Sequence, residues 1–354
     1  MKNQYLFGFL LIISLFSCKK EPLPVKEYQE GMGVFICNEG NFMSGNASLS
    51  FYNTITKKVS NHIFYNANGF PLGDVCQSMK IYGNYGFVVV NNSGKIMVIN
   101  TANFKHVATI SQLSSPRFVE IITATKAYVT DYANSSISIF NPSTFQQTGS
   151  IAVGSTTEAI CRLGDFVFVS TWSFGQKIYK INANSDQVVD SVTVVIQPNS
   201  MATDKNGKLW VLSDGGFNGN TYGWVNAALT RINPQEMSIE EVFTFDNKDL
   251  SPNRLQVTSG GDTLYFLKGG WGVNKANTGV CRMSIYEKTL PNTAIIPENG
   301  RLFYGLGIHP IDGSIYVSDA LDYVKKSWVY RYNSQANLVD SFQVEIGAGY
   351  FCFK

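Results

Sequence analysis

Short apolar runs that suit β-strands recur along the chain and are separated by polar or glycine-containing turns. Residues 127–141, AYVTDYANSSISIFN, hold two such runs, at 128–130 and 137–140, joined by the polar link 132–135. Aromatic and β-branched residues favour the pleated strand, so this stretch predicts a β-hairpin. The sequence that follows, 141–144 (NPST), predicts a turn, because Asn bonds its own backbone and Pro fixes a dihedral of the next turn position.

The same hairpin recurs in altered form along the whole chain. An aromatic residue marks the first strand of each copy, and successive copies are 52, 41, 40, 42, 55 and 51 residues apart, at Phe35, Phe87, Tyr128, Phe168, Trp210, Tyr265 and Tyr316. Asparagine follows the second strand in six copies, at Asn53, Asn100, Asn141, Asn182, Asn233 and Asn333. A period of about 40 to 55 residues with several short strands in each repeat predicts the blades of a β-propeller.

Each repeat is interpreted as four strands, lettered A to D from the axis of the ring outward. The second repeat shows all four, at residues 78–82, 87–90, 95–99 and 106–110. The first repeat has no good strand A before Val34, whereas the chain continues beyond the seventh repeat into 349–353. We expect these last residues to supply the missing strand, because a closed ring leaves no sheet edge exposed. The predicted fold is therefore all-β, a seven-bladed β-propeller that occupies residues 33–354 as one domain.

The composition agrees with a folded, strand-rich chain. Of 354 residues, 44% are hydrophobic and 13% aromatic, whereas 15% are charged, which indicates a large core and a weakly charged surface. Lysine and arginine number 28 against 26 aspartate and glutamate, the net charge is +2, and no basic run exceeds a lysine pair. Nucleic-acid binders carry a basic patch that attracts phosphates, so nucleic acid is not an expected partner.

The first 32 residues predict export and membrane attachment rather than a part of the fold. An apolar stretch of 12 residues, 5–16, is shorter than the ~20 residues that a membrane-spanning helix needs and fits a signal peptide, residues 1–17. Residues 15–18 (LFSC) resemble a bacterial lipobox, in which the cysteine is diacylated and becomes the new first residue. A lipidated Cys18 and the tether 18–32 would hold the domain to a membrane. The alternative is an ordinary secretory signal with a chance cysteine.

Several stretches carry a resemblance to known proteins. Strand 128–130 (YVT), with its Asn-containing link and ISIFN ending, resembles the YVTN-type repeat of seven-bladed propellers. The stretches 38–42 (NEGNF), 69–79 (GFPLGDVCQSM) and 90–96 (VNNSGKI) look like those of lipid-anchored surface propellers of Gram-negative gut bacteria. The best understood branch of that group captures cobalamin and related corrinoids and passes them to a TonB-dependent outer-membrane transporter. The resemblance covers residue 33 to the end and implies an outer-membrane, cell-surface lipoprotein that takes up a nutrient.

Loop length predicts which face of the ring binds a ligand. The A–B and C–D turns are short, whereas the B–C loops and D–A connections on the opposite face are longer and combine aromatics with Gly and Asn, most of all in 214–227 (DGGFNGNTYGWVNA). Such side chains stack on an apolar or planar ligand and hydrogen-bond its rim. The candidate ligand-binding residues in these loops are Phe42, Asn92, Tyr132, Trp172, Phe174, Phe217, Tyr222, Trp224 and Trp271.

The first residues of the A strands point at the mouth of the central channel on this same face. They add the candidates Arg117, Asn199, Arg254, Tyr304 and Tyr350. Arginine suits carboxylate, phosphate or amide oxygens, so Arg117 and Arg254 are expected to contact polar atoms of the ligand. Together with the resemblance, the set implies capture of a corrinoid, with aromatics against the macrocycle and Asn and Arg around its amide rim. The alternative is that the aromatics pack beneath their own loops as small local cores.

The sequence lacks four common catalytic or nucleotide-binding motifs. GxSxG, HExxH, Walker and Rossmann patterns are missing, and the three histidines fall in three different repeats. The five cysteines besides Cys18 include no close pair, which predicts small buried side chains rather than a zinc site or a disulfide scaffold. We therefore expect no catalytic residue, no metal and no cofactor.

Two other functions stay open. Some propellers hydrolyse lactones with a calcium ion held by one Glu, two Asn and one Asp near the channel, and Glu158, Asn199, Asn253 and Asp74 are candidates for such a set. A scaffold for a surface protein complex is the second alternative. A calcium ion bound on the channel axis would distinguish the hydrolase from both binding functions.

Overall fold

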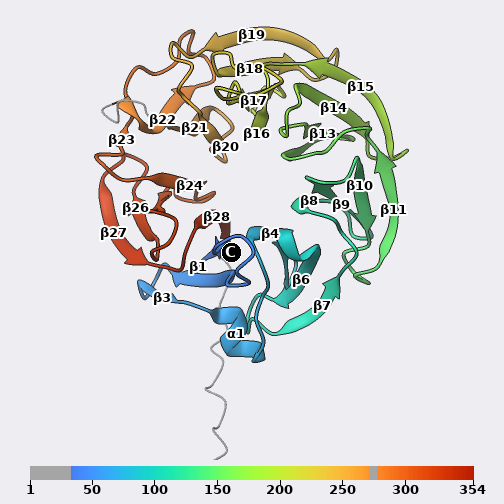
Figure 1. Ribbon diagram of the computed structural model, residues 1–354, viewed down its shortest axis with the longest axis vertical. Coiled ribbons are helices and arrows are strands. Elements are labelled where there is room, and N and C mark those ends of the chain that lie inside the picture. Colours follow the sequence, from blue (N-terminus) through green and yellow to red (C-terminus); the bar gives the residue numbers. More distant parts are fainter. Residues whose placement is uncertain (1–32, 271–276) are drawn as a thin grey trace, which may run out of the picture.

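The computed structural model describes residues 33–270 and 277–354, which form seven four-stranded antiparallel sheets around a central axis (Figure 1). The signal peptide, Cys18, the tether and Trp271 lie outside the described residues. Successive blades follow the chain around the ring, and strand A of each blade lies nearest the axis (Figure 1). The predicted all-β, seven-bladed propeller is therefore confirmed.

The strands of each blade are given in the order A to D. The first two blades contain β28 (Ala348–Phe353), β1 (Gly33–Asn38), β2 (Ser48–Asn53) and β3 (Lys58–Ser60), then β4 (Cys76–Tyr82), β5 (Tyr85–Val90), β6 (Lys95–Asn100) and β7 (His106–Ile110). The next two contain β8 (Pro116–Thr123), β9 (Lys126–Asp131), β10 (Ser136–Phe140) and β11 (Gln147–Ala152), then β12 (Ile160–Leu163), β13 (Phe166–Ser170), β14 (Lys177–Asn182) and β15 (Gln187–Thr193).

The remaining blades follow the same order. The fifth contains β16 (Pro198–Thr203), β17 (Leu209–Ser213), β18 (Ala228–Asn233) and β19 (Ser238–Thr244). The sixth contains β20 (Asn253–Val257), β21 (Thr263–Lys268), β22 (Gly279–Ser284) and β23 (Ile296–Pro297). The seventh contains β24 (Phe303–Ile308), β25 (Ile315–Asp319), β26 (Trp328–Tyr332) and β27 (Leu338–Gln343). The described residues also form two short helices, α1 (Ile63–Asn68) and the 3-10 helix η1 (Asn91–Ser93).

The C-terminal strand closes the ring, as the sequence predicts. β28 pairs with β1 in antiparallel register, with Phe35 opposite Cys352, and the Lys354 N–H donates to the Gly33 carbonyl over 2.9 Å. Neighbouring A strands contact each other all the way round, including β28 against both β4 and β24. Both ends of the described chain therefore lie in the first blade. The innermost strand of each blade faces the axis, so the closed ring shields the free edge of that strand from pairing with another chain.

Interior strands are buried on both faces because each blade packs against a neighbour on either side. Among the described residues, seven hydrophobic clusters fill the interfaces between adjacent blades. In β5, Val88 and Val90 belong to the interface with the first blade, whereas Phe87 and Val89 belong to the interface with the third. Successive side chains of a strand point to opposite faces, which explains why the FVVV run is apolar at every position.

The cysteines contribute to these interfaces. The five described cysteines are free, and Cys37, Cys76 and Cys352 pack in the cluster between the first two blades. Cys281 lies in the cluster between the fifth and sixth blades, and Cys161 packs against the one between the fourth and fifth. They act here as small apolar side chains, as their spacing predicts.

The recurring asparagines shape the C–D turns. In all six repeats that carry it, the side-chain oxygen of the asparagine accepts backbone N–H groups two to four residues later, as Asn141 does from Ser143 over 2.8 Å and Thr144 over 3.2 Å. Phe145, four positions after Asn141, has a φ of 62°, and Lys57, Phe104, Asp186 and Met237 repeat this left-handed conformation at the same offset. The asparagine pattern is thus a turn motif of the scaffold.

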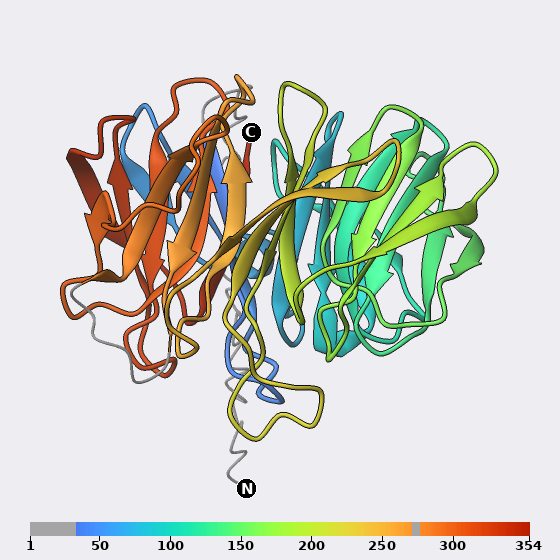
Figure 2. The same ribbon diagram turned by 90° about the horizontal axis from the view of Figure 1, so that it is seen from above.

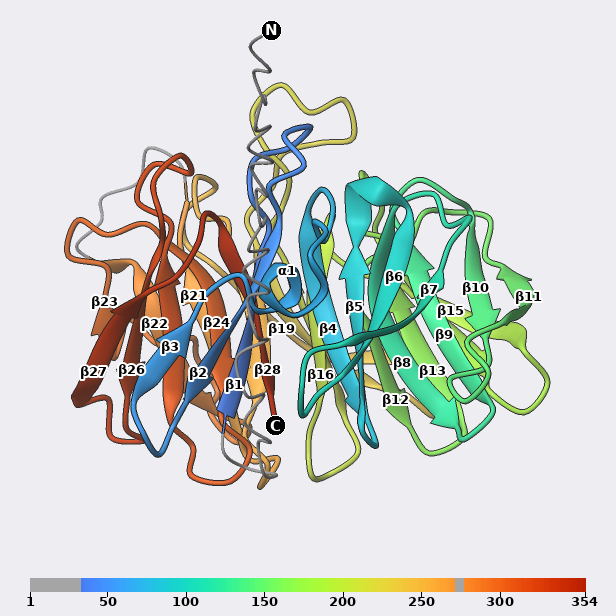
Figure 3. The ribbon, with the colours of Figure 1, turned by 90° about the horizontal axis from the view of Figure 1, so that it is seen from below.

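The two faces of the ring differ in their loops. The B–C loops between β1 and β2 and between β17 and β18 project from one face, which we call the site face, and the C-terminus lies at the opposite face (Figures 2 and 3). Helix α1 lies in the D–A connection from β3 to β4 and buries Ile63 and Phe64 in the cluster between the first two blades. Among the described residues, no helix has the length and apolar character needed to cross a membrane.

Candidate functional site

A cavity of about 700 Å³ opens at the mouth of the central channel on the site face, and we call it the mouth cavity. Its wall is built from the first residues of the A strands and from the B–C loops. Nine of the candidate residues line it: Phe42, Asn92, Arg117, Tyr132, Trp172, Asn199, Arg254, Tyr304 and Tyr350. The repeat brings these residues together, because equivalent positions of successive blades lie around one axis.

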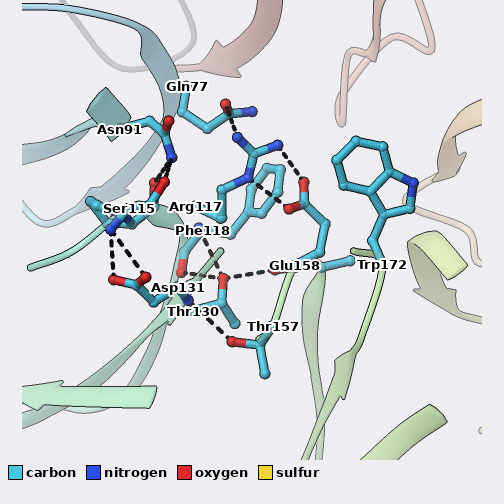
Figure 4. A network of polar contacts seen from close by, with 12 residues as sticks. Gln77, Asn91, Ser115, Arg117, Phe118, Thr130, Asp131, Thr157, Glu158 and Trp172 are labelled. Carbon is cyan, nitrogen blue, oxygen red and sulfur yellow. Dashed lines mark hydrogen bonds and ion pairs between the residues drawn. The ribbon is translucent and has the colours of Figure 1, made fainter. Parts of the chain in front are cut away.

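Arg117, at the start of β8, reaches from the third blade to both of its neighbours. Its guanidinium donates to the two carboxylate oxygens of Glu158 over 2.6 and 2.7 Å, and to the side-chain oxygen of Gln77 over 2.6 Å (Figure 4). The same guanidinium lies over the Tyr132 ring, 5.4 Å from its centroid. The Arg117 and Glu158 side chains are 15% and 7% exposed, so the pair is almost fully removed from water. Burial acts to lower the pKa of Arg117, but the Glu158 carboxylate outweighs it and the net shift is upward.

A second charged cluster consists of Glu39, Arg254 and Tyr304. The Tyr304 hydroxyl donates to Glu39 Oε2 over 2.6 Å, and the Arg254 guanidinium approaches Glu39 Oε1 to 3.8 Å. Arg254 Nε also donates to the Tyr304 carbonyl over 3.2 Å, and its guanidinium lies 5.3 Å from the centroid of the Tyr304 ring. Burial raises the pKa of the Glu39 carboxyl, and the opposing effects of Arg254 and Tyr304 do not cancel that shift.

The charges of the mouth cavity nearly balance. In the described part of the chain its charged lining residues are three acids, Glu39, Glu158 and Asp214, and two arginines, Arg117 and Arg254, and both arginines are already partnered by carboxylates. An anionic ligand therefore meets no excess of positive charge, contrary to what two arginines at the mouth suggest in the sequence. The arrangement favours a ligand that presents neutral amides and a flat apolar surface, because amide and aromatic side chains share the wall.

A second cavity of about 510 Å³, which we call the side cavity, lies between the B–C loops of the fourth and fifth blades. The candidates Phe174 and Phe217 line it. The two cavities adjoin, because they share the lining residues Tyr132, Trp172, Asp214 and Ser251. Together they bring eleven of the candidate residues to one end of the channel, namely the nine of the mouth cavity with Phe174 and Phe217.

Aromatic rings at the side cavity contact one another and remain open to solvent. The Tyr132 and Trp172 ring centroids are 5.8 Å apart at an interplanar angle of 44°, and Phe174 stacks on Tyr222 at 5.1 Å and 23°. Phe174, Phe217 and Tyr222 are 43%, 52% and 65% exposed. These three rings do not form a buried local core beneath their loops.

Asp214, the first residue after β17, is buried beside Trp172. Its Oδ2 accepts hydrogen bonds from Trp172 Nε1 over 2.8 Å and from Asn199 Nδ2 over 3.5 Å, and Oδ1 accepts one from the Gly216 N–H over 3.0 Å. Burial raises the pKa of the Asp214 carboxyl to about 6, because these neutral donors offset only part of the desolvation. Asp214 thus places a carboxylate at the junction of the two cavities, and none of the described lysines or arginines forms an ion pair with it.

Two of the remaining candidates line neither cavity, and the third is not among the described residues. Tyr222 lines neither cavity and contacts the site through Phe174. Trp224 also lines neither, since its Nε1 donates to the Lys248 carbonyl over 3.0 Å and the Lys248 ammonium lies 5.6 Å from its ring centroid. Trp271 lies outside the described residues. The predicted aromatic set therefore divides into rings that line a cavity and rings that lie at the rim.

The residues considered for a calcium site are engaged in other contacts. Both Glu158 oxygens accept hydrogen bonds from Arg117, whose positive charge opposes a cation at that carboxylate. Asp74 Oδ2 accepts from the Asn92 side chain over 2.6 Å, and Asn199 Nδ2 donates to a backbone carbonyl over 2.9 Å. Within the part of the chain that the structure describes, no group of three or more His, Cys, Asp or Glu side chains is placed to hold a metal ion.

Sequence reasoning did not single out three residues of the site, namely Glu39, Phe118 and Asp214. Glu39 and Asp214 directly follow the B strands β1 and β17, where the chain enters a long loop beside the channel. A carboxylate directly after a B strand, next to Gly and aromatic residues, is the sequence feature that could have identified Glu39 and Asp214. Phe118 follows Arg117, lines the mouth cavity and packs its ring against Tyr350 with centroids 5.9 Å apart.

Comparison with known proteins gives one family match. A family model described as Domain of unknown function (DUF5074) matches residues 32–353, which is nearly the whole length of the described chain. No curated protein matches the sequence.

Several solved structures share the fold. A quinonprotein alcohol dehydrogenase-like protein from Bacteroides thetaiotaomicron is 12% identical, with a TM-score of 0.69 over 91% of this chain and 78% of that chain. Hydrazine synthase from Kuenenia stuttgartiensis is 13% identical, with a TM-score of 0.60 over 77% and 87% of the two chains. The Cps50 (Swd1) β-propeller domain from Myceliophteria thermophila is 10% identical, with a TM-score of 0.59 over 83% and 96%. Likeness at such identities shows the fold and does not extend to activity.

Proposed function

The chain belongs to the DUF5074 domain family, and from this premise we propose that it is a non-enzymatic ligand-binding protein whose site is the mouth cavity. The main support for the proposal is that the nine candidate residues lining this one cavity come from all seven blades. A cavity of about 700 Å³ lies within the range of about 300–1,000 Å³ that is usual for small-molecule sites.

The proposed ligand is a corrinoid. This choice rests on the resemblance of residues 38–42, 69–79 and 90–96 to lipid-anchored surface propellers, a wider group whose best understood branch captures cobalamin. The chemistry of the cavity supports it, because a corrin macrocycle is broad and flat and carries neutral amide side chains around its rim. Tyr132 and Trp172 supply aromatic rings for contact with such a macrocycle, and a mouth whose two arginines are already paired with carboxylates suits neutral amides better than an anion.

A corrinoid is larger than the mouth cavity, so part of the ligand is expected to lie outside the cavity. Phe42, which lines the mouth and is 67% exposed, and Phe217, which lines the side cavity, are placed to contact that outer part. Capture and release then need no covalent step, and no residue of the site acts as a nucleophile or a general base in this proposal.

The proposed setting is the outer membrane, with the protein held by a lipidated Cys18, exposed on the cell surface and delivering its ligand to a TonB-dependent transporter. The signal-like start of the sequence and the family resemblance support this setting. Gly33 bonds to Lys354, at the C-terminal end on the face opposite the site (Figure 2). Gly33, the first described residue, therefore lies on the face away from the mouth cavity.

A scaffold role in a surface protein complex is the second candidate, and exposed apolar side chains around the mouth favour it. Met43 and Val324, on the B–C loops of the first and seventh blades, are 80% and 68% exposed. The two loops are joined, because the Asn41 side chain donates to the Tyr323 carbonyl over 2.7 Å. Contiguous exposed apolar surface marks protein contacts, so this rim is also suited to a protein partner.

Retention of a coloured ligand tests the proposal. Purified protein is incubated with cyanocobalamin, desalted, and examined for visible absorbance that elutes with the protein. Retained absorbance supports corrinoid capture, whereas colourless protein contradicts it. Tyr286→Ala serves as the matched control, because Tyr286 is an exposed aromatic residue in the C–D connection after β22 and lines neither cavity. This variant should retain as much ligand as the parent.

A further inference from the structure

The side cavity differs in chemistry from the mouth cavity. Its lining includes four aromatic residues, Tyr132, Trp172, Phe174 and Phe217, and among the described lining residues Asp214 is the only charged one. We propose that the side cavity is a subsite for an alkylammonium group, held by the aromatic ring faces and by the carboxylate of Asp214. This inference rests on the proposed binding role of the channel mouth but not on the identity of the ligand in the mouth cavity.

The aromatic rings are arranged as such a subsite requires. A cation is attracted to the negative face of an aromatic ring when it lies within about 6 Å of the ring centroid. Tyr132 and Trp172 form one side of the cavity with centroids 5.8 Å apart, and Phe174 is held in place by its stack on Tyr222. The chain already uses this kind of contact here, since the Arg117 guanidinium lies 5.4 Å from the Tyr132 centroid.

Asp214 supplies the negative charge. Its hydrogen-bond donors are the Trp172 indole, the Asn199 amide and the Gly216 N–H, all of which are neutral. In the described part of the chain no ion pair includes Asp214, although burial makes an isolated carboxylate costly and raises its pKa to about 6. Above that pH the side cavity therefore contains an ionised group with no positive partner among the described residues, and a bound ammonium group would supply one.

The third blade has an aspartate at the position that corresponds to Ser213, one before Asp214, and it shows what a purely structural carboxylate looks like. Asp131, at the end of β9, is 2% exposed and accepts hydrogen bonds from four backbone N–H groups, those of Ser114, Ser115, Ala133 and Asn134. Asp214 accepts one backbone hydrogen bond, and its other oxygen is turned to Trp172 and Asn199 at the cavity. A carboxylate offers about four acceptor sites, so Asp214 retains capacity that Asp131 has used.

Choline and its neutral isostere 3,3-dimethylbutan-1-ol test the proposal, because they share a shape and differ in charge. Both are titrated into the purified protein at pH 8 by isothermal titration calorimetry. Choline is expected to bind at least about ten-fold more tightly than the alcohol, because the aromatic ring faces and the Asp214 carboxylate both attract its positive charge. Asp214→Asn should abolish that preference, and Phe217→Leu should weaken choline more than the alcohol. Asp131→Asn should lower the melting temperature and keep the preference.

Three results would overturn the proposal: equal affinities for the two probes, a preference that survives in Asp214→Asn, or no choline binding at millimolar concentration. Cyanocobalamin retention on the same preparation separates this failure from that of the proposed function. Protein that retains cobalamin but shows no preference for choline refutes the ammonium subsite alone. Protein that prefers choline but retains no cobalamin supports the subsite and refutes the corrinoid.

Discussion

Arg117 and Glu158 form a bidentate ion pair in the wall of the mouth cavity, with nitrogen–oxygen distances of 2.6 and 2.7 Å. Arg117 belongs to β8 of the third blade and Glu158 precedes β12 of the fourth, so the pair joins two blades next to the axis. Gln77 in β4 adds a contact from the second blade. The wall of the proposed site is therefore also a structural clamp between three blades.

Removal of Arg117 is expected to destabilise the protein. In Arg117→Met the Glu158 carboxylate stays buried without its partner, which costs about 3–5 kcal/mol of unfolding free energy. Equilibrium unfolding in urea measures the loss. The double variant Arg117→Met, Glu158→Gln removes the isolated charge and should recover part of that stability. An Arg117→Met protein as stable as the parent would show that the pair does not clamp the blades.

The stability of the protein is expected to depend on pH through Asp214. The pKa of this carboxyl is about 6 in the folded protein against 3.8 ordinarily, so the folded state binds the proton more tightly than the unfolded state. Stability should therefore fall as pH rises from about 4 to about 6, by up to about 3 kcal/mol, and should not fall further above that window. Urea unfolding of the parent relative to Asp214→Asn isolates this effect. A difference between the two proteins that stays constant from pH 4 to 7 would refute it.

Tyr128 is expected to matter for stability and not for binding. Its side chain is fully buried in the interface between the third and fourth blades, and its hydroxyl donates to Asp186. Tyr128→Ala should cost about 3–5 kcal/mol through the cavity it creates, whereas Tyr128→Phe should cost about 1–3 kcal/mol through the lost hydrogen bond. Guanidinium unfolding measures both. Tyr128→Phe should retain ligand as the parent does, and a loss of ligand binding in this folded variant would contradict the assignment.

Regular features of the fold could be predicted from the sequence because each repeats. The FVVV run in β5 is apolar throughout since its side chains alternate between two interfaces, and six asparagines mark the same turn. Ring closure could be predicted by counting strands. The first repeat lacks a strand A, and the residues that follow the seventh repeat supply one. Loop length also indicated which face carries the long B–C loops. These inferences need only local pattern and the rule that sheet edges must be covered.

The electrostatics of the site could not be predicted, because they depend on which side chains meet between blades. Arg117 and Glu158 are 41 positions apart, and the sequence does not show that their charges cancel. Trp224 stands in the most aromatic loop, yet its indole bonds to the Lys248 carbonyl and lines neither cavity. In the sequence Asp214 has the pattern of an ordinary loop residue. Its contact with Trp172, which belongs to another blade, is visible only in the structure.

The most direct test of the central claim is a calorimetric titration of cyanocobalamin into the parent protein, Trp172→Ala and Tyr286→Ala. Trp172 lines both cavities, whereas Tyr286 is exposed in a C–D connection and lines neither. Thermal melts establish that each variant is folded. We expect saturable binding to the parent and to Tyr286→Ala, with affinity at least about ten-fold weaker in Trp172→Ala because a central aromatic contact is lost. Absence of binding to the parent, or equal affinity in all three proteins, would contradict it.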